Sequence, residues 1–320
     1  MNQPTVSVII PTYNHARFIG TCLDRVLKQD YPVSEILVVD DGSTDETEKL
    51  VQTFGDRVRY HRQENQGQAV ARAWGLRQVD SDLVCLLDSD DYWEPGFLAS
   101  AIPQFENSRL GIAFANHDRV NTEGKAFEPN VFQNERDWIL PFVSKGGPGE
   151  WTILDETATS QLYFSHFPHT PSGAVFRRSL LKHFPDPKQK RGDDYLFFMN
   201  YLIESRCETA FTMDVLWHLR THDRNIRQLG KNQDLLFKSD IRAKRELLKK
   251  HANQINPQEV SMLRRLIASD LFDWGYSYRQ RKKLTKAASK YLAACKWDRG
   301  GPITRKSLLG LPGLLLSVFR

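Results

Sequence analysis

Apolar runs alternate with stretches of helical spacing through the first 120 residues. Five short apolar runs predict β-strands; they lie at 6–10, 36–40, 58–62, 83–87 and 112–116. Four stretches between them predict helices; they lie near 16–29, 44–54, 67–79 and 95–106. Strands that alternate with helices of this length predict an α/β fold with a mostly parallel central sheet flanked by helices.

Two of these helices carry a start signal in their sequence. Ser43 is followed three residues later by Glu46, which predicts a capping box directly after the turn at 40–42. Pro95 suits the first turn of the helix predicted near 95–106, because the N–H groups of a first turn have no partner within the helix.

The pattern changes twice further along the chain. From 121 to 230 it is irregular, and the stretch Lys-Gly-Gly-Pro-Gly at 145–149 predicts a flexible break. After 230 three stretches with helical spacing predict a C-terminal helical extension; they lie at 233–251, 257–280 and 284–296. The predicted divisions are therefore 1–120, 121–230 and 231–320.

The net charge of +5 conceals an asymmetry. Residues 231–320 hold 20 Lys and Arg against 7 Asp and Glu, whereas the first 230 residues hold 24 against 32. A basic tail on an acidic body indicates contact with anionic lipid head groups or an anionic acceptor. A solvated helical face is an equal alternative. The apolar end at 308–319 is too short to span a membrane, and either lies on its surface or packs on the body.

The four cysteines are scattered and form no CxxC pair. Cys22 and Cys85 fall within apolar patterns, which predicts reduced core thiols and a cytoplasmic protein. The first residues carry neither a basic segment nor a cleavage site, so they predict a strand and not a signal peptide. Nor does any stretch approach the roughly 20 apolar residues of a membrane span.

An acidic run, Asp-Ser-Asp-Asp at 88–91, ends the apolar segment 83–87. Carboxylates gathered at a strand end repel one another unless a cation lies among them. A divalent ion of the magnesium or manganese kind is the expected cation, because it prefers hard oxygen ligands and often bridges to phosphate. Polar clusters at 12–14 and 40–41 also follow strands. Ligands bind beyond the carboxyl ends of such strands, so we expect these clusters to meet in one crevice.

Four groups of segments, in this order, resemble the family-2 glycosyltransferases, which are inverting nucleotide-sugar enzymes with the GT-A fold. They are VSVIIPTYNH (6–15), ILVVDDGSTDET (36–47), NQGQAVARAWGL (65–76) with LVCLLDSDDYW (83–93), and SGAVFRRSLL (172–181) with GDDYLFF (192–198). The VDDGSTD and DSDD pair at this spacing is the specific signal, and 231–320 has no such match. The resemblance implies a nucleotide-sugar-binding half at 1–120 and an acceptor-binding half at 121–230.

The resemblance assigns the nucleotide site to residues from four of these segments, namely Pro11, Thr12, Tyr13, Asp40, Asp41, Gln68, Arg72 and Asp88. Tyr13 is expected to pack on the base and Asp41 to accept a hydrogen bond from the base edge. Asp41 alternatively serves as a turn residue or helix cap, and Gln68 and Arg72 as solvated helix residues. The family often has Arg-Asn where this chain has Arg72-Ala73, which puts an amide contact there in doubt.

The resemblance places a divalent metal on the acidic run. Asp90 is the first choice as ligand, with Asp91 and His222 as further candidates; Asp88 and Asp90 lie on one face of an extended chain and Asp91 on the other. The metal would bridge the two phosphates, and Arg220 would hold the diphosphate. A purely structural role for His222 is an equal alternative.

Inversion at the anomeric carbon requires one general base that faces the acceptor hydroxyl. The family's acidic pair, usually Glu-Asp, corresponds to Asp193-Asp194 here, so the first member departs from the family pattern. We expect Asp194 to be the base, with Asp193 as the alternative, although either one also suits the cap of a helix from Tyr195 to Ile203. Nothing in the spacing singles out the acceptor candidates, which are Trp138, Trp151, His166 and His169.

These features predict a glycosyltransferase that moves a sugar from a nucleotide-diphosphate donor, with a UDP-sugar expected, to a sugar, lipid-linked or other hydroxyl. The expected cofactor is Mn²⁺ or Mg²⁺, and the expected setting is surface polysaccharide or glycolipid synthesis in the cytoplasm or on the inner face of the membrane, without nucleic acid. One alternative is a sugar-phosphate nucleotidyltransferase, although the first strand is followed by Pro-Thr-Tyr-Asn at 11–14 and not by a Gly-rich basic loop. Another is a catalytically silent nucleotide-sugar-binding protein.

Overall fold

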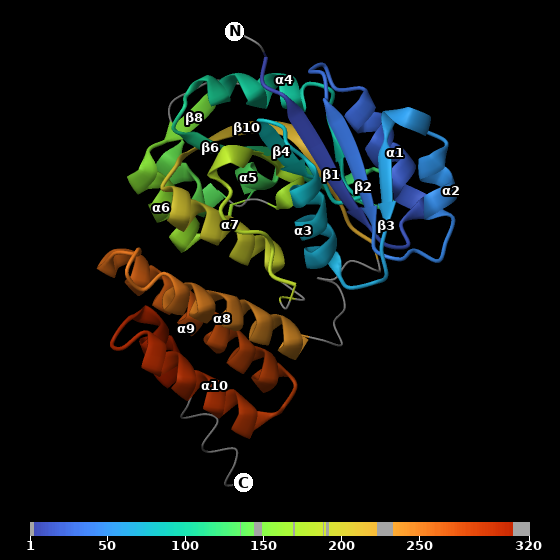
Figure 1. The fold of residues 1–320 in the computed structure, drawn as a ribbon. Helices are drawn as coiled ribbons and strands as arrows, with labels where there is room; N and C mark the ends of the chain where they lie inside the picture. Colours follow the sequence, from blue (N-terminus) through green and yellow to red (C-terminus); the bar gives the residue numbers. More distant parts are fainter. Residues whose placement is uncertain are drawn as a thin grey trace. The chain divides into compact units, whose positions relative to one another are not determined.

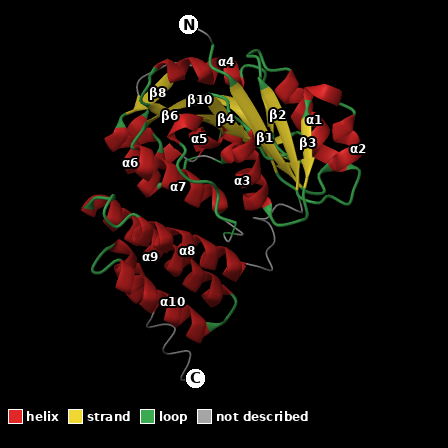
Figure 2. Ribbon diagram, in the orientation of Figure 1, coloured by secondary structure: helices red, strands yellow, loops and turns green. Residues whose placement is uncertain are grey.

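The chain divides into two compact units, Met1–Gln228 and Leu229–Arg320. The computed structural model describes residues 3–134, 136–143, 149–168, 170–187, 189, 192–222 and 233–309. The first unit is an α/β domain and the second is helical, as the ribbon in Figure 1 and the colouring in Figure 2 show.

One sheet forms the centre of the first unit, with strand order β3-β2-β1-β4-β9-β6-β10-β5 and with β7 and β8 paired to β6 and β10. The strands are β1 Val6–Thr12, β2 Glu35–Asp40, β3 Arg59–Arg62, β4 Leu83–Leu86, β5 Tyr92–Trp93, β6 Leu110–Val120, β7 Ala126–Glu128, β8 Trp151–Leu154, β9 Ala174–Arg177 and β10 Glu208–Arg220. Pairing is parallel from β3 to β4 and between β6 and β10, and antiparallel elsewhere. The predicted α/β class, with helices on the sheet and a helical extension, is confirmed.

Helices cover this sheet because their apolar residues recur on one face. They are α1 Ala16–Leu27, α2 Thr47–Gln52, α3 Gln68–Gln78, α4 Phe97–Ala101, α5 Val131–Asn134, α6 Glu156–Ser165 and α7 Asp193–Ser205. On α1 the buried Ile19, Leu23 and Val26 join one hydrophobic core with Val8 and Val38 of the sheet. Cys22 and Cys85 lie in the same core as free thiols, as predicted.

The predicted capping box at Ser43 is wrong, since α2 begins four residues later at Thr47 and Glu46 occupies its N-cap without a side-chain bond. Ser43 is committed elsewhere: its N–H donates to Asp40 Oδ1 and its hydroxyl accepts from the N–H of Asn14. The helix predicted near 95–106 also ends earlier, and Ile102–Glu106 continues it as a 3₁₀ helix. Pro103 explains this change, because proline cannot donate the hydrogen bond of an α-helix interior.

The irregular stretch after residue 120 contains structure that its pattern did not predict. β10 is the longest strand, and its pairing with β6 shifts register between Thr212 and Val215 and again before Trp217. Such bulges break the alternation of apolar and polar positions on which strand prediction depends. Gly173 permits a close approach here, because a Cβ at this position would lie 2.3 Å from the indole Nε1 of Trp217.

The second unit consists of α8 Gln233–Lys250, α9 Pro257–Gln280 and α10 Leu284–Trp297, close to the predicted bounds. A capping box opens α9, with Asn256 and Glu259 exchanging hydrogen bonds and Pro257 in the first turn. Ile267, Trp274 and Tyr291 form the centre of a separate hydrophobic core. Among the described helices of both units, none has the length and apolar character needed to cross a membrane.

Candidate active site

The polar clusters predicted to converge do so at the carboxyl ends of β1, β2 and β4. Parallel pairing places Thr12 beside Asp40, and Leu87 follows β4 with its N–H bonded to Ile9 of β1. The acidic run 88–91 therefore begins at the same edge of the sheet as Tyr13 and Asp41. This is where ligands bind in open α/β sheets.

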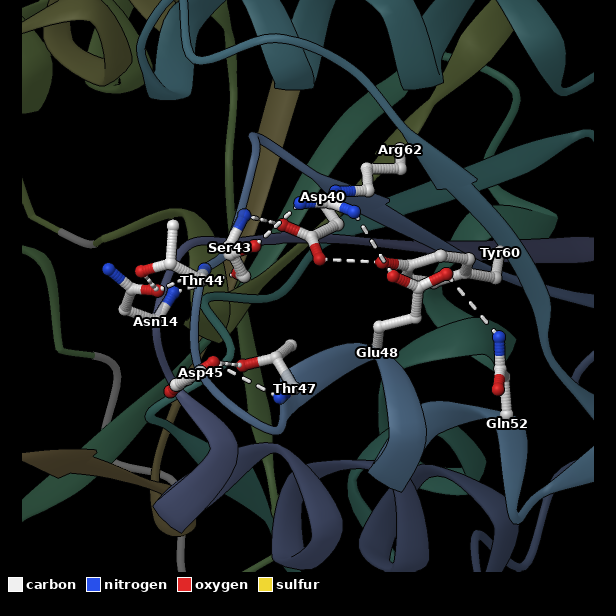
Figure 3. A network of polar contacts seen from close by, with 10 residues as sticks. All are labelled: Asn14, Asp40, Ser43, Thr44, Asp45, Thr47, Glu48, Gln52, Tyr60 and Arg62. Atoms are coloured by element: carbon white, nitrogen blue, oxygen red, sulfur yellow. Dashed lines mark hydrogen bonds and ion pairs between the residues drawn. The ribbon is translucent and has the colours of Figure 1, made fainter.

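A network of polar side chains fixes the loops after β1 and β2 (Figure 3). Asp40 has no exposed surface; its carboxylate accepts from the N–H of Ser43 at 2.7 Å and from the Tyr60 hydroxyl at 2.6 Å. Asn14, at a positive φ of 54°, accepts from the N–H of Thr44 at 2.7 Å. Asp40 thus holds the turn that follows β2, beside the crevice.

Asp41 fastens the loop that precedes α3. Its carboxylate accepts from the Gln63 amide at 2.7 Å, from the N–H of Gln66 at 2.9 Å and from the N–H of Gly67 at 2.7 Å. Gly67 has φ of 100°, a conformation that favours glycine. The backbone of this loop is therefore held by the single carboxylate of Asp41. The hydrogen bond predicted from the nucleotide base to Asp41 would be an additional one.

Arg72 connects the two acidic clusters of the crevice. Its guanidinium donates to Asp88 at 2.5 Å and to Asp193 at 2.7 Å, and Arg72 is only 3% exposed. Burial alone would lower the pKa of Arg72, but Asp88 and Asp193 outweigh it and raise that pKa. Gln68, one turn earlier on α3, donates to the same oxygen of Asp88 at 2.8 Å. Gln68 and Arg72 are therefore bonded inside the crevice, and neither is a solvated helix residue.

Three side chains from distant segments form a candidate metal centre. Ligand atoms of His15, Asp90 and His222 all lie within 4.8 Å of one another, and His222 Nε2 is 2.9 Å from Asp90 Oδ2. Burial lowers the pKa of His15, which favours the neutral imidazole that binds metals. The carboxylate of Asp90 is buried too, yet His222 and His15 outweigh that effect and lower its pKa. Two imidazole nitrogens and one anionic oxygen are a donor set that fits Mn²⁺ better than Mg²⁺.

Asp91 lies on the other side of the acidic run. Its carboxylate accepts from the Ser172 hydroxyl at 2.6 Å and from the N–H of Arg220 at 2.9 Å, and burial raises its pKa strongly. Ser172 also accepts from the N–H of Asp88 at 3.1 Å. This geometry joins β10 to the acidic run, and it gives no support to Asp91 as a metal ligand.

Arg220, predicted to hold the diphosphate, is 6% exposed and packs against aromatic rings. Its guanidinium carbon lies 5.0 Å from the ring centre of Phe18 and 5.2 Å from that of Tyr92. Phe18 also packs against His222, with ring centres 4.8 Å apart. Arg220 therefore stands beside the candidate metal centre, and the faces of two aromatic rings stabilise its guanidinium.

The acidic pair at the start of α7 is divided by environment. Gly192, with φ of 64°, occupies the N-cap position, and both Asp residues lie in the first turn of α7, where Asp194 Oδ1 accepts from the N–H of Tyr195 at 2.8 Å. Asp193 is 7% exposed and paired with Arg72, whereas Asp194 is only partly buried. Asp194 is therefore the member of the pair that faces solvent without an ion-pair partner among the described residues.

The end of β1 offers a base-sized surface. Tyr13 is 46% exposed, a large fraction for an aromatic side chain, while Pro11 and Thr12 are buried in β1. Within the described part of the chain, the Thr12 hydroxyl is buried and has no hydrogen-bond partner. The exposed ring of Tyr13 suits a ligand with a flat face.

Two of the acceptor candidates lie together. The rings of Trp138 and His166 stack with centres 4.3 Å apart and planes 10° from parallel. Trp151 instead packs on the main core and donates to Ser100 at 2.9 Å, and His169 lies outside the described residues.

Sequence reasoning missed His15, Ser89 and Ser172. His15 ends the first motif directly after β1, and its Nδ1 lies 2.8 Å from the Ser89 hydroxyl. One signal could have identified His15: it follows the same strand as Thr12 and Tyr13, which were both assigned to the nucleotide site. Ser172 begins a segment of the family resemblance, but spacing could not reveal its partners Asp88 and Asp91, which are more than 80 residues away.

Solved structures share this architecture. TarS of S. aureus (residues 1–349) in complex with UDP-GlcNAc matches with a TM-score of 0.67 and 18% identity over 92% of this chain and 81% of that one. The mannosyltransferase PcManGT of Pyrobaculum calidifontis, in complex with GDP-Man and Mn²⁺, matches with a TM-score of 0.58 and 21% identity over 98% and 81%. The fold is thus the GT-A α/β fold.

The sequence also matches a family model, "Glycosyl transferase family 2", over residues 7–184. This chain belongs to glycosyl transferase family 2. Glycosyltransferase GlyA of Streptococcus pneumoniae is 34% identical over 119 residues, 36% of this chain and 17% of GlyA. An uncharacterized glycosyltransferase of Nostoc sp. is 31% identical over 157 residues, 43% of this chain and 49% of the relative. The match therefore spans less than half the length of either relative.

Proposed function

We propose that this chain transfers a sugar from a nucleoside-diphosphate sugar to an acceptor hydroxyl with inversion at the anomeric carbon. The observation that carries the proposal is Arg72, whose guanidinium joins Asp88 on the donor side to Asp193, the neighbour of the proposed base. The structural neighbours in complex with UDP-GlcNAc and with GDP-Man support a donor of this class. We favour a UDP-sugar as donor.

On the donor side, the nucleotide lies beyond the ends of β1 and β2. Tyr13 supplies the face on which the base packs, and the loop held by Asp41 forms the opposite wall. Pro11 and Thr12 shape the floor, and Asp88, held by Gln68 and Arg72, faces the ribose and the sugar.

Asp194 acts as the general base. A single displacement requires a carboxylate that removes the proton of the attacking hydroxyl while the nucleoside diphosphate departs. Asp194 is accessible, and Asp193 is neutralised by Arg72, so the two members of the pair have separate tasks. Asp193 sets the position of α7, and through it the position of Asp194.

His15, Asp90 and His222 would hold a divalent metal, with Mn²⁺ as the better fit. When bound, such an ion neutralises charge on the diphosphate leaving group. Arg220 lies beside this centre and adds a fixed positive charge for the same oxygens.

The first 120 residues would then form the donor half, residues 121–230 the acceptor half, and 231–320 a separate helical region. Trp138 and His166 offer a stacked aromatic surface for a sugar acceptor. We place the reaction in the synthesis of a surface polysaccharide or glycolipid in the cytoplasm, since the free cysteines suit a reducing compartment.

Thermal-shift measurements with UDP, GDP and dTDP, each with and without Mn²⁺, test the donor assignment. We expect UDP with Mn²⁺ to raise the melting temperature more than UDP alone, and more than GDP or dTDP. A melting temperature that no nucleotide changes would contradict the proposal. Release of UDP from a UDP-sugar then separates an active transferase from a silent binding protein.

A further inference from the structure

The helical C-terminal unit carries far more exposed positive charge than its composition suggests. Of the seven Asp and Glu between 233 and 309, only Asp273 is exposed, and the other six are buried or partly buried. Several of the others are used internally: Glu259 caps α9, Asp270 pairs with Lys244, and Asp298 accepts from backbone N–H groups at 303 and 304. Most Lys and Arg of this unit are exposed. Its surface is therefore strongly cationic.

Part of this charge is ordered into a strip on α8. Lys238, Arg242, Arg245 and Lys249 are all exposed, and their spacing of four, three and four residues places them on one face of the helix. Leu235, 50% exposed, precedes them on the same face. The four basic residues thus form a cationic row along this helix of 18 residues, and Leu235 adds an apolar side chain at its N-terminal end.

Residues of α10 extend this edge sideways. Lys290 lies 3.6 Å above the ring of Trp274, and Lys286, one turn earlier, lies 5.7 Å from the ring of Tyr278. Arg245 of α8 lies 5.2 Å from the ring of Trp297 at the end of α10. Contacts from both helices to these aromatic rings bring the two sets of cations onto one surface. We call Lys238, Arg242, Arg245, Lys249, Lys286 and Lys290 the basic strip.

The rings beneath the basic strip hold its side chains in place. Trp274 stacks with Phe237 and with Tyr278, and Asp234 accepts from the Trp274 indole, the Tyr278 hydroxyl and Arg281. Burial, and after it repulsion by nearby Lys238, lowers the pKa of Lys290. An anion bound beside Lys290 would oppose both effects.

We infer that the basic strip binds the phosphate-bearing head groups of an anionic lipid bilayer. A bilayer fits better than nucleic acid, because single strands stack their bases on open aromatic faces, whereas Trp274 and Tyr278 are each 5% exposed and covered by cations. The exposed Leu235 adds an apolar contact that suits the boundary between head groups and acyl chains. The inference does not depend on sugar transfer.

Sedimentation of the full chain with vesicles tests this inference. We expect binding to vesicles of equal parts phosphatidylcholine and phosphatidylglycerol, little binding to phosphatidylcholine alone, and weakening as salt is raised. Each basic residue near an anionic surface strengthens binding about five-fold. The variant Lys238→Glu/Arg242→Glu should therefore bind at least about ten-fold more weakly.

The matched control is Arg264→Glu/Lys296→Glu, which changes the net charge equally at exposed residues outside the basic strip. It should bind within about three-fold of the wild type, because neither residue belongs to the basic strip. The charge-keeping variant Lys238→Arg/Arg242→Lys should bind like the wild type, and unchanged circular dichroism melts exclude misfolding. Any of three results would overturn the inference. The two charge-reversal variants could lose binding equally, the wild type could bind neutral vesicles as tightly as anionic ones, or it could bind single-stranded RNA more tightly than anionic vesicles.

Discussion

Arg72 and Asp193 are 121 residues apart in the chain and form a buried ion pair of 2.7 Å. The other arm of the same guanidinium holds Asp88 at 2.5 Å. Burial raises the pKa of both carboxyls, and Arg72 opposes that rise. One cation from α3 thus offsets part of the cost of burying two carboxylates of the crevice, one on the donor side and one beside the proposed base.

Arg72→Met should cost both activity and stability. Removal of one partner leaves buried carboxylates without compensation, which typically costs about 3–5 kcal/mol of unfolding free energy. We expect a large fall in melting temperature and loss of sugar transfer. Arg77→Met on the same helix is the control, since Arg77 is exposed and should change stability by less than about 0.5 kcal/mol. A melting temperature as high for Arg72→Met as for Arg77→Met would refute the structural role.

Asp194→Asn should lower kcat by about 10²–10⁴-fold with little change in KM for the donor, because it removes the proton acceptor and leaves the donor site intact. Its melting temperature should match that of the wild type, since Asp194 is partly exposed. Asp193→Asn should lower the melting temperature, because the charge opposite Arg72 is lost. If Asp193→Asn folds normally and stops transfer while Asp194→Asn stays active, the general base is Asp193.

His15→Ala should lower the apparent affinity for Mn²⁺ by about 10–100-fold, a range known for residues around metal sites. A thermal-shift titration with Mn²⁺ measures this affinity. The same loss is expected for Asp90→Ala and His222→Ala, because the three ligand atoms cluster within 4.8 Å. His183→Ala is the control, because the His183 side chain is 53% exposed. A normal Mn²⁺ titration of His15→Ala would remove His15 from the site.

Asp234→Asn should lower the stability of the helical unit at neutral pH by about 0.5–1 kcal/mol, allowing for the partial exposure of the group. Hydrogen bonds from Arg281, Tyr278 and Trp274 outweigh burial and lower the pKa of Asp234 from 3.8 to about 2. A lowered folded-state pKa contributes stability above the unfolded value that disappears as pH falls. The difference in melting temperature from the wild type should therefore shrink as the pH falls from about 4 through about 2. A difference that is as large at pH 2 as at neutral pH would contradict this origin.

Gly173→Ala should destabilise the first unit by about 1–3 kcal/mol, because the new Cβ would overlap the indole of buried Trp217. Gly20→Ala in α1 is the matched control: its Cβ meets only the end of the Leu50 side chain at 3.2 Å, and alanine favours a helix. Chemical denaturation compares the two. Equal denaturation midpoints for both variants would show that the Trp217 indole moves aside for the new Cβ at little cost.

The sequence predicted the first half of the fold well because local signals determine it. Strands β1, β2 and β4 are buried apolar runs that end at polar clusters, and parallel pairing brings such ends together. The second half depends on β10, whose bulges disturb the alternation, and on β9, which enters between β4 and β6 from far along the chain. No local pattern reports that insertion.

The candidate site divides in the same manner. Asp90 with His222 was predicted from motif position, and the structure brings these two side chains together. Arg72 was predicted to contact the nucleotide, but its partner Asp193 lies too far along the chain for spacing to reveal the bridge. The same distance concealed Ser172 beneath the acidic run. Contacts of this kind arise from tertiary packing alone.

The long strand β10 gives the molecule an unequal response to truncation. A chain that ended near residue 206 would retain Tyr13, Asp41 and the loop before α3, and so both walls proposed for the base. It would lack His222 and the backbone N–H of Arg220 that binds Asp91, together with the strand that pairs with β5, β6 and β8. Proteolytic trimming or a premature stop there would therefore remove His222 from the candidate metal centre and Ala210 and Trp217 from the main core in one step.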